Sequence, residues 1–299
     1  MANASLGYVN ENDMLMVSDT STYDALEIEG DNLFRYSPVD AKHAEALGDI
    51  VYSLGIEYVY LADFEMWGWT EPYYQAFKTK FEANGGTIIL RAIDNSLAEA
   101  EVSEAIAIHG AEKVGAVGIV WIPEFVITEL ETYPGLSSVL WFGAMEDQGS
   151  DWDIIDEVGG FQNQLRFLTP KRSGEFSAKW RSFSEKFSTA VGYAPSYYDG
   201  AWYDAAWCLA LTILETGSTD ARRVKEMLPE VSSRNNGVTG NCGLNSAGDR
   251  EPGRYDIWGY ANVDGEDTSI KYGEYNAYSD STPWDAHALM LYLNINPWD

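Results

Sequence analysis

Two periods of hydrophobic and polar residues alternate along the first half of the chain. Short apolar runs bounded by turn residues predict buried strands at 58–62, 87–93, 116–122 and 139–142. Apolar residues at every third or fourth position predict helices at 39–54, 70–84 and 97–109, with a short helix after Pro123. Strands that alternate with helices are typical of βα units. This half is therefore expected to form a Rossmann-like lobe with a mostly parallel sheet.

The second half begins with helices and ends with strands. A long helix is expected at 174–191. A second helix at 199–216 is apolar around almost its whole circumference, which predicts burial on most sides. Beyond Gly237 the pattern shortens to two strands, 255–263 and 268–275, separated by acidic turn residues. This arrangement predicts a β-hairpin.

The acidic turn of this hairpin could also be interpreted as a metal site. Asn262, Asp264, Glu266 and Asp267 supply oxygen ligands of the kind that calcium loops use. The spacing lacks the bidentate Glu that closes such a loop. A turn is therefore the simpler interpretation, and no metal site is assigned.

One segment, Asp31–Asp40, joins a strand to the start of a helix. Ser37 is placed to cap the helix, and Pro38 suits its first position. The Asp40 carboxylate lies in the first turn, where unpaired N–H groups favour negative charge. Such a helix start can be purely structural, because capping boxes are common.

Composition indicates a folded protein that does not bind nucleic acid. The 299 residues allow two lobes or one large α/β domain, and a content of 45% hydrophobic and 14% aromatic residues excludes a disordered chain. Asp and Glu number 47 against 19 Lys and Arg, and the formal charge of −28 would repel phosphate backbones and anionic membranes. The acids spread along the whole chain, which favours a solvated surface over an acidic site for a cationic partner.

Targeting signals and cysteines are sparse. The chain as given has neither an apolar stretch of membrane-spanning length nor a basic N-terminal region followed by an apolar one, so no span and no export signal are expected. Cys208 and Cys242 are the two cysteines, which excludes a disulfide framework or metal-type spacing. One disulfide and two separate buried thiols both remain open.

Six short motifs occur in the order found in a known family. They are Asp31–Asp40, Asp63-Phe64-Glu65-Met66-Trp67-Gly68, Phe81-Glu82-Ala83-Asn84-Gly85-Gly86-Thr87, Trp141-Phe142-Gly143, Tyr203-Asp204-Ala205-Ala206 and Gly237-Val238-Thr239-Gly240. Each motif alone is weak. Together, in this order and spacing, they resemble the branched-chain amino-acid binding proteins of ABC importers.

This resemblance implies an α/β fold of two Rossmann-like lobes with mostly parallel sheets, as in type I periplasmic-binding proteins. Three crossovers are expected, near Tyr36, near Thr169-Pro170 and near Gly248-Asp249, with Asp249-Arg250 as a hinge pair. Lobe one would hold residues 1–36 and 170–248, and lobe two residues 37–169 and 249–299. Short crossovers allow two rigid lobes to hinge and close on a small ligand.

The chain departs from this family at its start. Members carry roughly 80 to 100 more residues ahead of the segment that resembles Asp13–Thr22. Those residues supply the opening strands of lobe one and a Ser-rich loop that grips the ligand. Lobe one is therefore expected to be incomplete at its N-terminus, and a segment that completes it is an expected partner.

Ligand-binding residues are expected at the carboxyl ends of strands, where α/β sheets bind small molecules. By resemblance, hydroxyl and N–H groups of a loop early in the chain hold the α-carboxylate and ammonium of the ligand. The loop residues are Ser18, Thr20, Ser21 and Thr22, with Ser21 and Thr22 as first choices. An ordinary Ser/Thr-rich turn is the alternative.

Lobe two is expected to supply further contacts. Trp67 matches the position of an aromatic wall in the family, and Gly68 allows close backbone approach, although Trp67 could instead be a core residue. Trp121 and Glu124 follow another strand, and Glu146 resembles the acidic residue that pairs with the ligand's ammonium. In so acidic a chain, each glutamate could equally be a solvated surface residue.

Catalysis is not expected. The histidines at positions 43, 109 and 287 lie near no nucleophile motif, and phosphate-loop, dinucleotide and His-Glu-x-x-His motifs are absent from the sequence. A glycosidase that uses two carboxylates and Trp platforms is an alternative, because paired acids have no fixed sequence spacing.

The sequence therefore predicts a non-catalytic solute-binding protein, extracytoplasmic by resemblance, without a cofactor. It would capture a small amino acid or related amide in an interlobe cleft and hand it to an ABC permease. A ligand-sensing receptor domain, or a truncated paralogue of the same fold, is the main alternative.

Overall fold

A computed structural model describes residues 2–63, 70–119, 132–144, 166–174 and 177–296. The chain divides into two compact units. Unit 1 comprises Met1–Lys42 and Ser173–Arg254, and unit 2 comprises His43–Arg172 and Tyr255–Asp299. Each unit is thus assembled from two separate chain segments.

Unit 2 is built on a seven-stranded sheet with strand order β4-β3-β5-β6-β7-β8-β9. The strands are β3 (Tyr58–Ala62), β4 (Thr87–Ala92), β5 (Val114–Gly118), β6 (Leu140–Gly143), β7 (Phe167–Ser173), β8 (Arg254–Val263) and β9 (Glu266–Asn276). Every neighbouring pair from β4 to β7 is parallel. The expected α/β fold with a mostly parallel sheet is confirmed.

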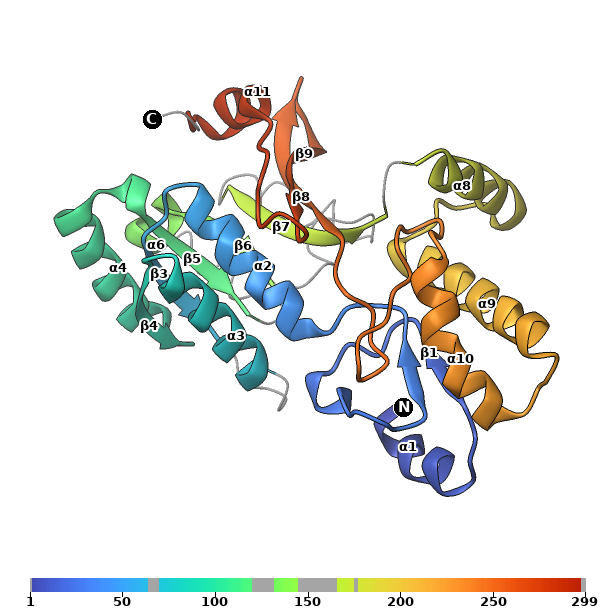
Figure 1. Cartoon of the computed structure of the whole chain (residues 1–299). Helices are drawn as coiled ribbons and strands as arrows, with labels where there is room; N and C mark the ends of the chain where they lie inside the picture. Colours follow the sequence, from blue (N-terminus) through green and yellow to red (C-terminus); the bar gives the residue numbers. More distant parts are fainter. Residues whose placement is uncertain (1, 64–69, 120–131, 145–165, 175–176, 297–299) are drawn as a thin grey trace. The chain divides into compact units, whose positions relative to one another are not determined.

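Helices cover both faces of this sheet (Figure 1). They are α2 (Asp40–Ser53), α3 (Thr70–Ala83), α4 (Asn95–His109), α6 (Pro134–Ser138) and α11 (Ala286–Ala288), with one-turn helices η2 (Ala111–Lys113) and η3 (Leu289–Leu293). Val59 packs with Phe77 in the core under α2, α3 and α11. Its neighbour Tyr60 packs with Val102 in the core under α4 and α6. Successive strand residues therefore serve opposite faces, as the pleat requires.

The predicted hairpin is present in unit 2. β8 and β9 are neighbours joined by Asp264-Gly265, whose φ angles of 54° and 93° are those of a two-residue hairpin turn. The Asn262 side-chain oxygen accepts a hydrogen bond from the Gly265 N–H at 3.0 Å. Among the residues that the structure describes, no group of three or more metal-binding side chains could hold an ion.

The described residues of unit 1 form a two-stranded parallel sheet and four longer helices. Its elements are α1 (Ala2–Glu11), β1 (Met16–Ser18), the one-turn helix η1 (Asp24–Leu26), β2 (Leu33–Arg35), α8 (Ala178–Val191), α9 (Tyr197–Thr216) and α10 (Ala221–Arg234). The core joins β2 to α9 and α10 through Phe34, Ala205 and Leu228. α9 and α10 lie side by side (Figure 1). Sequence periodicity did not predict α1, α10 or β7.

The prediction that α9 is buried on most sides is wrong. Ala201, Ala205 and Cys208 are buried, but Trp202, Trp207 and Leu214 are 54%, 50% and 76% exposed. We call this second side, Trp202, Ala206, Trp207, Ala210 and Leu214, the outer face of α9. An apolar sequence shows what a helix could bury. It does not show that neighbours exist on every side.

The start of α2 also differs from its prediction. The Ser37 hydroxyl does not cap the helix but donates to the Asp19 carbonyl, and Ser37 is fully buried. A carboxylate oxygen of Asp24 instead accepts a hydrogen bond from the Ala41 N–H at 2.9 Å. Asp24 lies 17 residues upstream of the helix N–H that it satisfies, so local spacing could not have indicated this contact.

Buried charges join the two chain segments of unit 1. The Arg35 guanidinium donates to both carboxylate oxygens of Asp249, at 2.5 and 2.6 Å, and both residues are almost fully buried. The neighbouring Arg250 donates to Thr239 Oγ1 at 2.6 Å and to the Asn241 carbonyl at 2.9 Å. Burial of such charges is tolerable because each is hydrogen-bonded to a partner.

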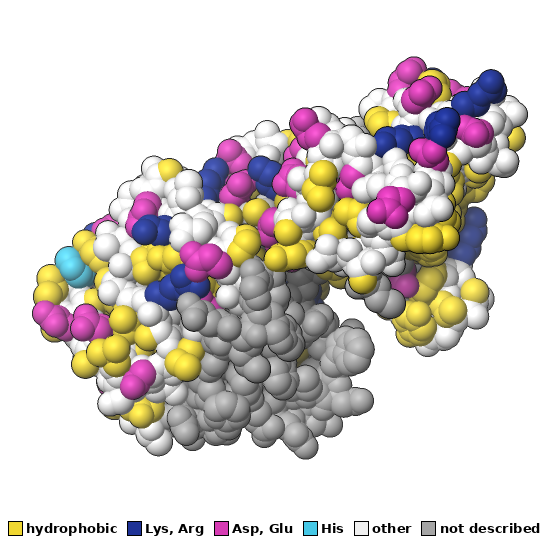
Figure 2. All heavy atoms as spheres, turned by 90° about the horizontal axis from the view of Figure 1, so that it is seen from below, with side chains coloured by type: hydrophobic (Ala, Val, Ile, Leu, Met, Phe, Trp, Pro, Cys, Tyr) yellow, Lys and Arg dark blue, Asp and Glu magenta, His cyan; other side chains and the backbone are white. Residues whose placement is uncertain are grey.

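The surface of the described residues carries charged side chains of both signs (Figure 2). Figure 2 shows acidic side chains scattered across the described part of one face, among Lys and Arg. Within the described residues, no helix is long and apolar enough to cross a membrane.

Candidate functional site

The loop after β1 carries four of the predicted ligand-binding residues. Ser18 ends the strand, and its Oγ accepts a hydrogen bond from the Ser21 N–H at 3.1 Å. Two hydrogen bonds from other segments of unit 1 fix the backbone of the loop. Arg35 donates to the Ser21 carbonyl at 3.1 Å, and the Asp40 N–H donates to the Thr22 carbonyl at 2.9 Å. The backbone of the loop is therefore fixed by its own unit.

The side chains of this loop make fewer hydrogen bonds to described residues than its backbone does. The Ser21 and Thr22 hydroxyls are half-buried and make no hydrogen bond to another described residue. Thr20 is exposed, with its hydroxyl 3.5 Å from the Asp19 carboxylate. The loop thus presents two available hydroxyl groups beside one negative charge. The hydroxyls suit polar groups of either sign, and Asp19 favours a cationic group.

The remaining predicted site residues lie outside the described part of the chain: Trp67, Gly68, Trp121, Glu124 and Glu146. The strand ends that lead to them are described. The Ile119 N–H donates to the Ala62 carbonyl at 3.0 Å, and the Ala144 N–H donates to the Gly118 carbonyl at 2.9 Å. The carboxyl ends of β3, β5 and β6 therefore lie at one edge of the sheet.

This edge includes a reversal of strand order. From β3 the chain proceeds to β4 on one side, and then crosses to β5 on the other side of β3. Open α/β sheets bind ligands beyond the carboxyl ends of strands at such a switch point. Backbone geometry alone thus marks the edge between β3 and β5 as a candidate ligand site.

A charged cluster at the same edge was missed by sequence reasoning. Arg91, near the end of β4, donates to the Asp63 carboxylate at 2.6 Å and to Glu71 at 2.7 Å, and its guanidinium lies 3.9 Å from the centre of the Tyr74 ring. Burial lowers the pKa of Arg91, but its hydrogen bonds to Glu71 and Asp63 raise the pKa by more. An Asp directly after one buried strand and an Arg near the end of the next could have indicated this pair.

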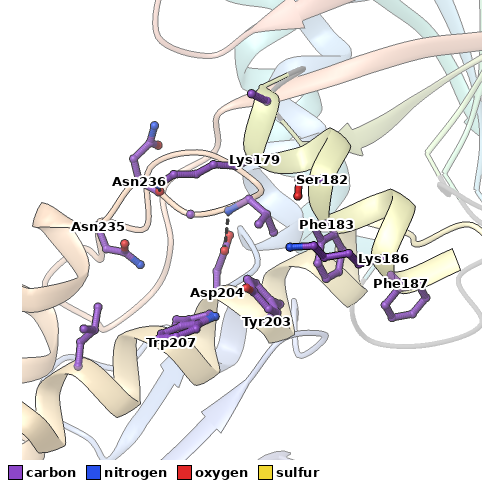
Figure 3. Close-up of a pocket in the computed structure, with 14 residues that line it drawn as sticks. Lys179, Ser182, Phe183, Lys186, Phe187, Tyr203, Asp204, Trp207, Asn235 and Asn236 are labelled. Carbon is purple, nitrogen blue, oxygen red and sulfur yellow. Dashed lines mark hydrogen bonds between the residues drawn. The ribbon is translucent and has the colours of Figure 1, made fainter. Parts of the chain in front are cut away.

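A cavity of about 690 Å³ lies within unit 1, between α8, α9 and the segment after α10 (Figure 3). Its apolar lining consists of Phe183, Phe187, Tyr203, Trp207, Leu211 and Val238. The Phe183 and Tyr203 rings lie 5.0 Å apart between centres. The volume falls in the range of small-molecule sites. The i,i+4 pairs Phe183/Phe187 and Tyr203/Trp207 were the sequence signal for this lining.

The polar lining of the cavity is mostly basic and amide. Lys179 donates to the Asn236 carbonyl, and Lys186 lies further along α8 (Figure 3). Asp204 is 1% exposed, and its carboxylate accepts hydrogen bonds from the Val238 N–H at 2.7 Å, the Thr239 N–H at 3.0 Å and the Thr239 hydroxyl. Because the Asp204 charge is satisfied by its own unit, the cavity can hold an apolar group that carries an anion.

A family model described as "Receptor family ligand binding region" matches residues 2–262 of the chain. The chain belongs to this family. A curated relative is an uncharacterized protein of Methanocaldococcus jannaschii. It is 23% identical over an alignment of 285 residues, which covers 84% of this chain. The matched region spans 66% of the length of that relative.

Solved structures place this member of the receptor-family ligand-binding region in the type I periplasmic-binding fold. An ABC transporter substrate-binding protein of Desulfitobacterium hafniense, in complex with Leu, has a TM-score of 0.69 and 18% identity over 89% of this chain and 76% of its own. A leucine-binding protein of Thermotoga maritima has a TM-score of 0.68 and 19% identity over 93% and 77%. A solute-binding protein of R. palustris in complex with benzoate has a TM-score of 0.62 and 16% identity over 90% and 74%. The resemblance and fold predicted from the sequence are confirmed.

Proposed function

We propose that this chain is a non-catalytic solute-binding protein that captures a small amino acid or a related amide outside the cytoplasmic membrane and delivers it to an ABC permease. The observation that carries the proposal is the shared edge at the carboxyl ends of β3, β5 and β6, where the strand order reverses. Membership of a ligand-binding family supports the proposal, as do similar structures that are named as leucine binders.

In this proposal the β1 loop recognises the polar end of the ligand. The Ser21 and Thr22 hydroxyls would bind the α-carboxylate, and the nearby Asp19 would favour the ammonium. Trp67 and Gly68 would contact the ligand's side chain, with further contacts from Trp121, Glu124 and Glu146. The motif order of the sequence supports these roles.

A second ligand class is favoured by the cavity in unit 1. Aromatic rings and two lysines suit an aromatic carboxylate, because rings stack and the ammonium groups attract the anion. A similar structure that is named as a benzoate complex supports testing this class. The two ligand classes would use different residues, so variants can separate them.

The first experiment is a thermal-shift screen of the purified chain in low and high salt against amino acids, small amides, benzoates, polyamines and sugars. A ligand at about 100 times its Kd should add roughly 2.7 kcal/mol of stability. The proposal expects amino acids or amides to be the strongest hits. It also expects them to be recovered unchanged after incubation. A sugar hit with product release would instead support the glycosidase alternative.

Calorimetric titration of three variants then assigns the site. Trp67→Ala should weaken amino-acid binding by about 1–3 kcal/mol through lost apolar contact, and Thr22→Val should weaken it through a lost hydrogen bond. Trp207→Ala should leave amino-acid binding unchanged and weaken any benzoate binding. Thr79→Val, whose exposed side chain lies on α3, is the matched control. Unchanged amino-acid affinity in both Trp67→Ala and Thr22→Val would remove the proposed site.

Docking to a permease separates the transport role from the sensor alternative. The liganded protein should stimulate ATP hydrolysis by an ABC permease of the same organism, reconstituted in vesicles. Binding to a kinase or receptor segment, without such stimulation, would assign the chain to sensing.

A further inference from the structure

The two cysteines of unit 1, 34 positions apart in the sequence, share one side-chain partner. Cys208 lies in α9, and Cys242 follows the turn after α10. The Asn235 side-chain nitrogen is 3.1 Å from Cys208 Sγ and 3.9 Å from Cys242 Sγ. Both thiols are fully buried and belong to the same core cluster. The fold has therefore placed both sulfur atoms within 4 Å of one amide nitrogen.

Backbone contacts hold this arrangement in position. The Cys242 N–H donates to the Asn235 carbonyl at 3.0 Å, and the Gly237 N–H donates to the Gly240 carbonyl at 2.8 Å, so residues 235–242 form a closed turn. Asn235 is thus tied to Cys242 by its backbone and to Cys208 by its side chain. A bond between the two sulfurs would join α9 directly to this turn.

We propose that Cys208 and Cys242 are a disulfide-forming pair that locks α9 to the turn after α10 when the protein matures under oxidising conditions. Both cysteines are free in the described structure, which therefore represents the reduced pair. The bond would close a loop that contains all of α10. Closing such a loop removes conformational freedom from the unfolded chain and stabilises the folded unit.

The surroundings of Cys208 suit it to react first. Its pKa is lowered by hydrogen bonds from Cys242, Asn235, Tyr36 and Ser232, although burial opposes this effect. The single S–H of Cys242 has two acceptors available, the Cys208 sulfur and the Gly240 carbonyl at 3.6 Å. Donors that surround one sulfur stabilise its thiolate, which is the attacking form in disulfide exchange.

The reaction balances with a small-molecule disulfide as oxidant. The Cys208 thiolate attacks one sulfur of oxidised glutathione, which breaks the glutathione disulfide and releases one glutathione thiolate. Cys242 transfers its proton to a thiolate and attacks Cys208 Sγ, which releases the second glutathione. Two protein thiols are oxidised and one small disulfide is reduced to two thiols. Because both cysteines are buried, exchange occurs during folding or on local opening of the turn.

Thiol counting on the full chain tests the proposal directly. The protein is unfolded in urea, refolded with oxidised glutathione, unfolded again and treated with N-ethylmaleimide before intact-mass measurement. The proposal expects no label on the oxidised protein and two labels after reduction. Two labels on the refolded oxidised protein would overturn it, as would a bond between chains on a non-reducing gel.

Thermal unfolding tests whether the folded unit accommodates the bond. Oxidised wild-type protein should melt about 3–8 °C above the reduced protein. The double variant Cys208→Ala/Cys242→Ala should show no dependence on reductant. An oxidised form that melts at or below the reduced form would overturn the proposal, because the native geometry would then be strained by the bond.

Discussion

Unit 1 and unit 2 are each stabilised by different kinds of internal contact. Unit 2 has a seven-stranded sheet with helices on both faces, and Phe77 and Trp141 are almost completely buried. Unit 1 has a two-stranded sheet, and Trp207 and Leu214 on its α9 are largely exposed. A pair of strands alone is at best marginally stable in water, so unit 1 needs other contacts.

In unit 1 those other contacts are buried charges and capped turns. Arg35 binds Asp249, Asp204 binds the turn at Val238 and Thr239, and Asp24 binds the Ala41 N–H of the same unit. The comparison teaches that a wide sheet gains stability from apolar area, whereas a narrow one depends on a few polar contacts that each join distant segments. Substitutions at five positions, each with its control, test this difference.

Phe77→Ala in unit 2 should be one of the two variants with the largest effect on the free energy of unfolding. Phe77 is fully buried against the sheet, so its removal should lower the free energy of unfolding by about 3–5 kcal/mol through lost burial and a cavity. Urea unfolding measures this loss. Phe187→Ala on α8 of unit 1 is the matched control, because Phe187 is only half-buried. Equal losses in both variants would contradict the comparison.

In unit 1, Asp249→Ala should destabilise by a similar amount, about 3–5 kcal/mol, because it leaves the buried Arg35 guanidinium unpaired. Hydrogen exchange should show the loss in α9 and α10 peptides before α4. Arg222→Ala breaks an exposed ion pair with Asp13 and should change nothing measurable. Protection that falls first in α4 would contradict the assignment of this pair to unit 1.

Gly237→Ala should have a smaller but clear effect. A Cβ at Gly237 would lie 2.2 Å from the Asp204 carboxylate, so the turn or the carboxylate must move, at a cost of about 1–3 kcal/mol. Thermal unfolding is the measurement. The control is Gly7→Ala in α1, where no atom lies within 4 Å and helix propensity favours Ala. A Gly237→Ala variant as stable as Gly7→Ala would remove the Asp204 turn from the contacts that stabilise unit 1.

Asp24 gives a prediction that depends on pH. Burial raises the pKa of Asp24, the Ala41 N–H lowers it and the Asp40 charge raises it, with a net increase. The folded state therefore keeps the proton to higher pH than the unfolded chain. The stability that Asp24 contributes is fully present below its ordinary pKa, and is lost as pH rises through the folded pKa.

Asp24→Asn keeps a side-chain oxygen for the Ala41 N–H but cannot ionise. Wild-type protein should therefore lose stability relative to Asp24→Asn as the pH rises above the ordinary carboxyl pKa of about 4, which a comparison of pH 4 with pH 7 can show. Asp24→Ala should be less stable than Asp24→Asn by about 0.5–2 kcal/mol, because the cap is lost. Urea midpoints at both pH values measure these differences. A constant gap between wild type and Asp24→Asn would refute the pH prediction.

The smallest effect is expected on the outer face of α9. Leu214 is 76% exposed, so Leu214→Glu should change the free energy of unfolding by less than about 0.5 kcal/mol. Light scattering should show equal or lower self-association, because an exposed apolar group is removed. Thr216→Val at the end of α9 is a control for substitution in this helix. A large destabilisation by Leu214→Glu would mean that another segment covers this face.

Sequence reasoning succeeded where the signal was local. The apolar run at 58–62 predicted β3, because a buried strand needs consecutive apolar residues. The turn at Asp264-Gly265 predicted the hairpin, because residues of these types favour the positive φ angles of a two-residue turn. The strand order also agreed with the expected α/β fold. These features needed no knowledge of contacts between distant segments.

Sequence reasoning failed where contacts between residues that are distant in the sequence determine the structure. Ser37 had the spacing of a cap, but Asp24 supplies the contact, and no local pattern distinguishes the two. α9 looked buried because its composition is apolar. Arg91 and Asp63 meet only because β3 and β4 are adjacent. For the candidate site, the β1 loop and the strand ends were indicated in advance, whereas the cavity beside α8 was not.

The pairing of Arg35 with Asp249 has a consequence for synthesis on the ribosome. The two residues are 214 positions apart, so Arg35 emerges long before its carboxylate exists. At about 5–20 residues per second, the delay is roughly 10–40 s. During that interval β3 to β7 are complete and their parallel core can form, while the N-terminal segment of unit 1 waits with an unpaired guanidinium. The order of synthesis thus allows β3 to β7 of unit 2 to pack before the Arg35–Asp249 pair of unit 1 can form, whereas β8 and β9 complete the sheet of unit 2 last.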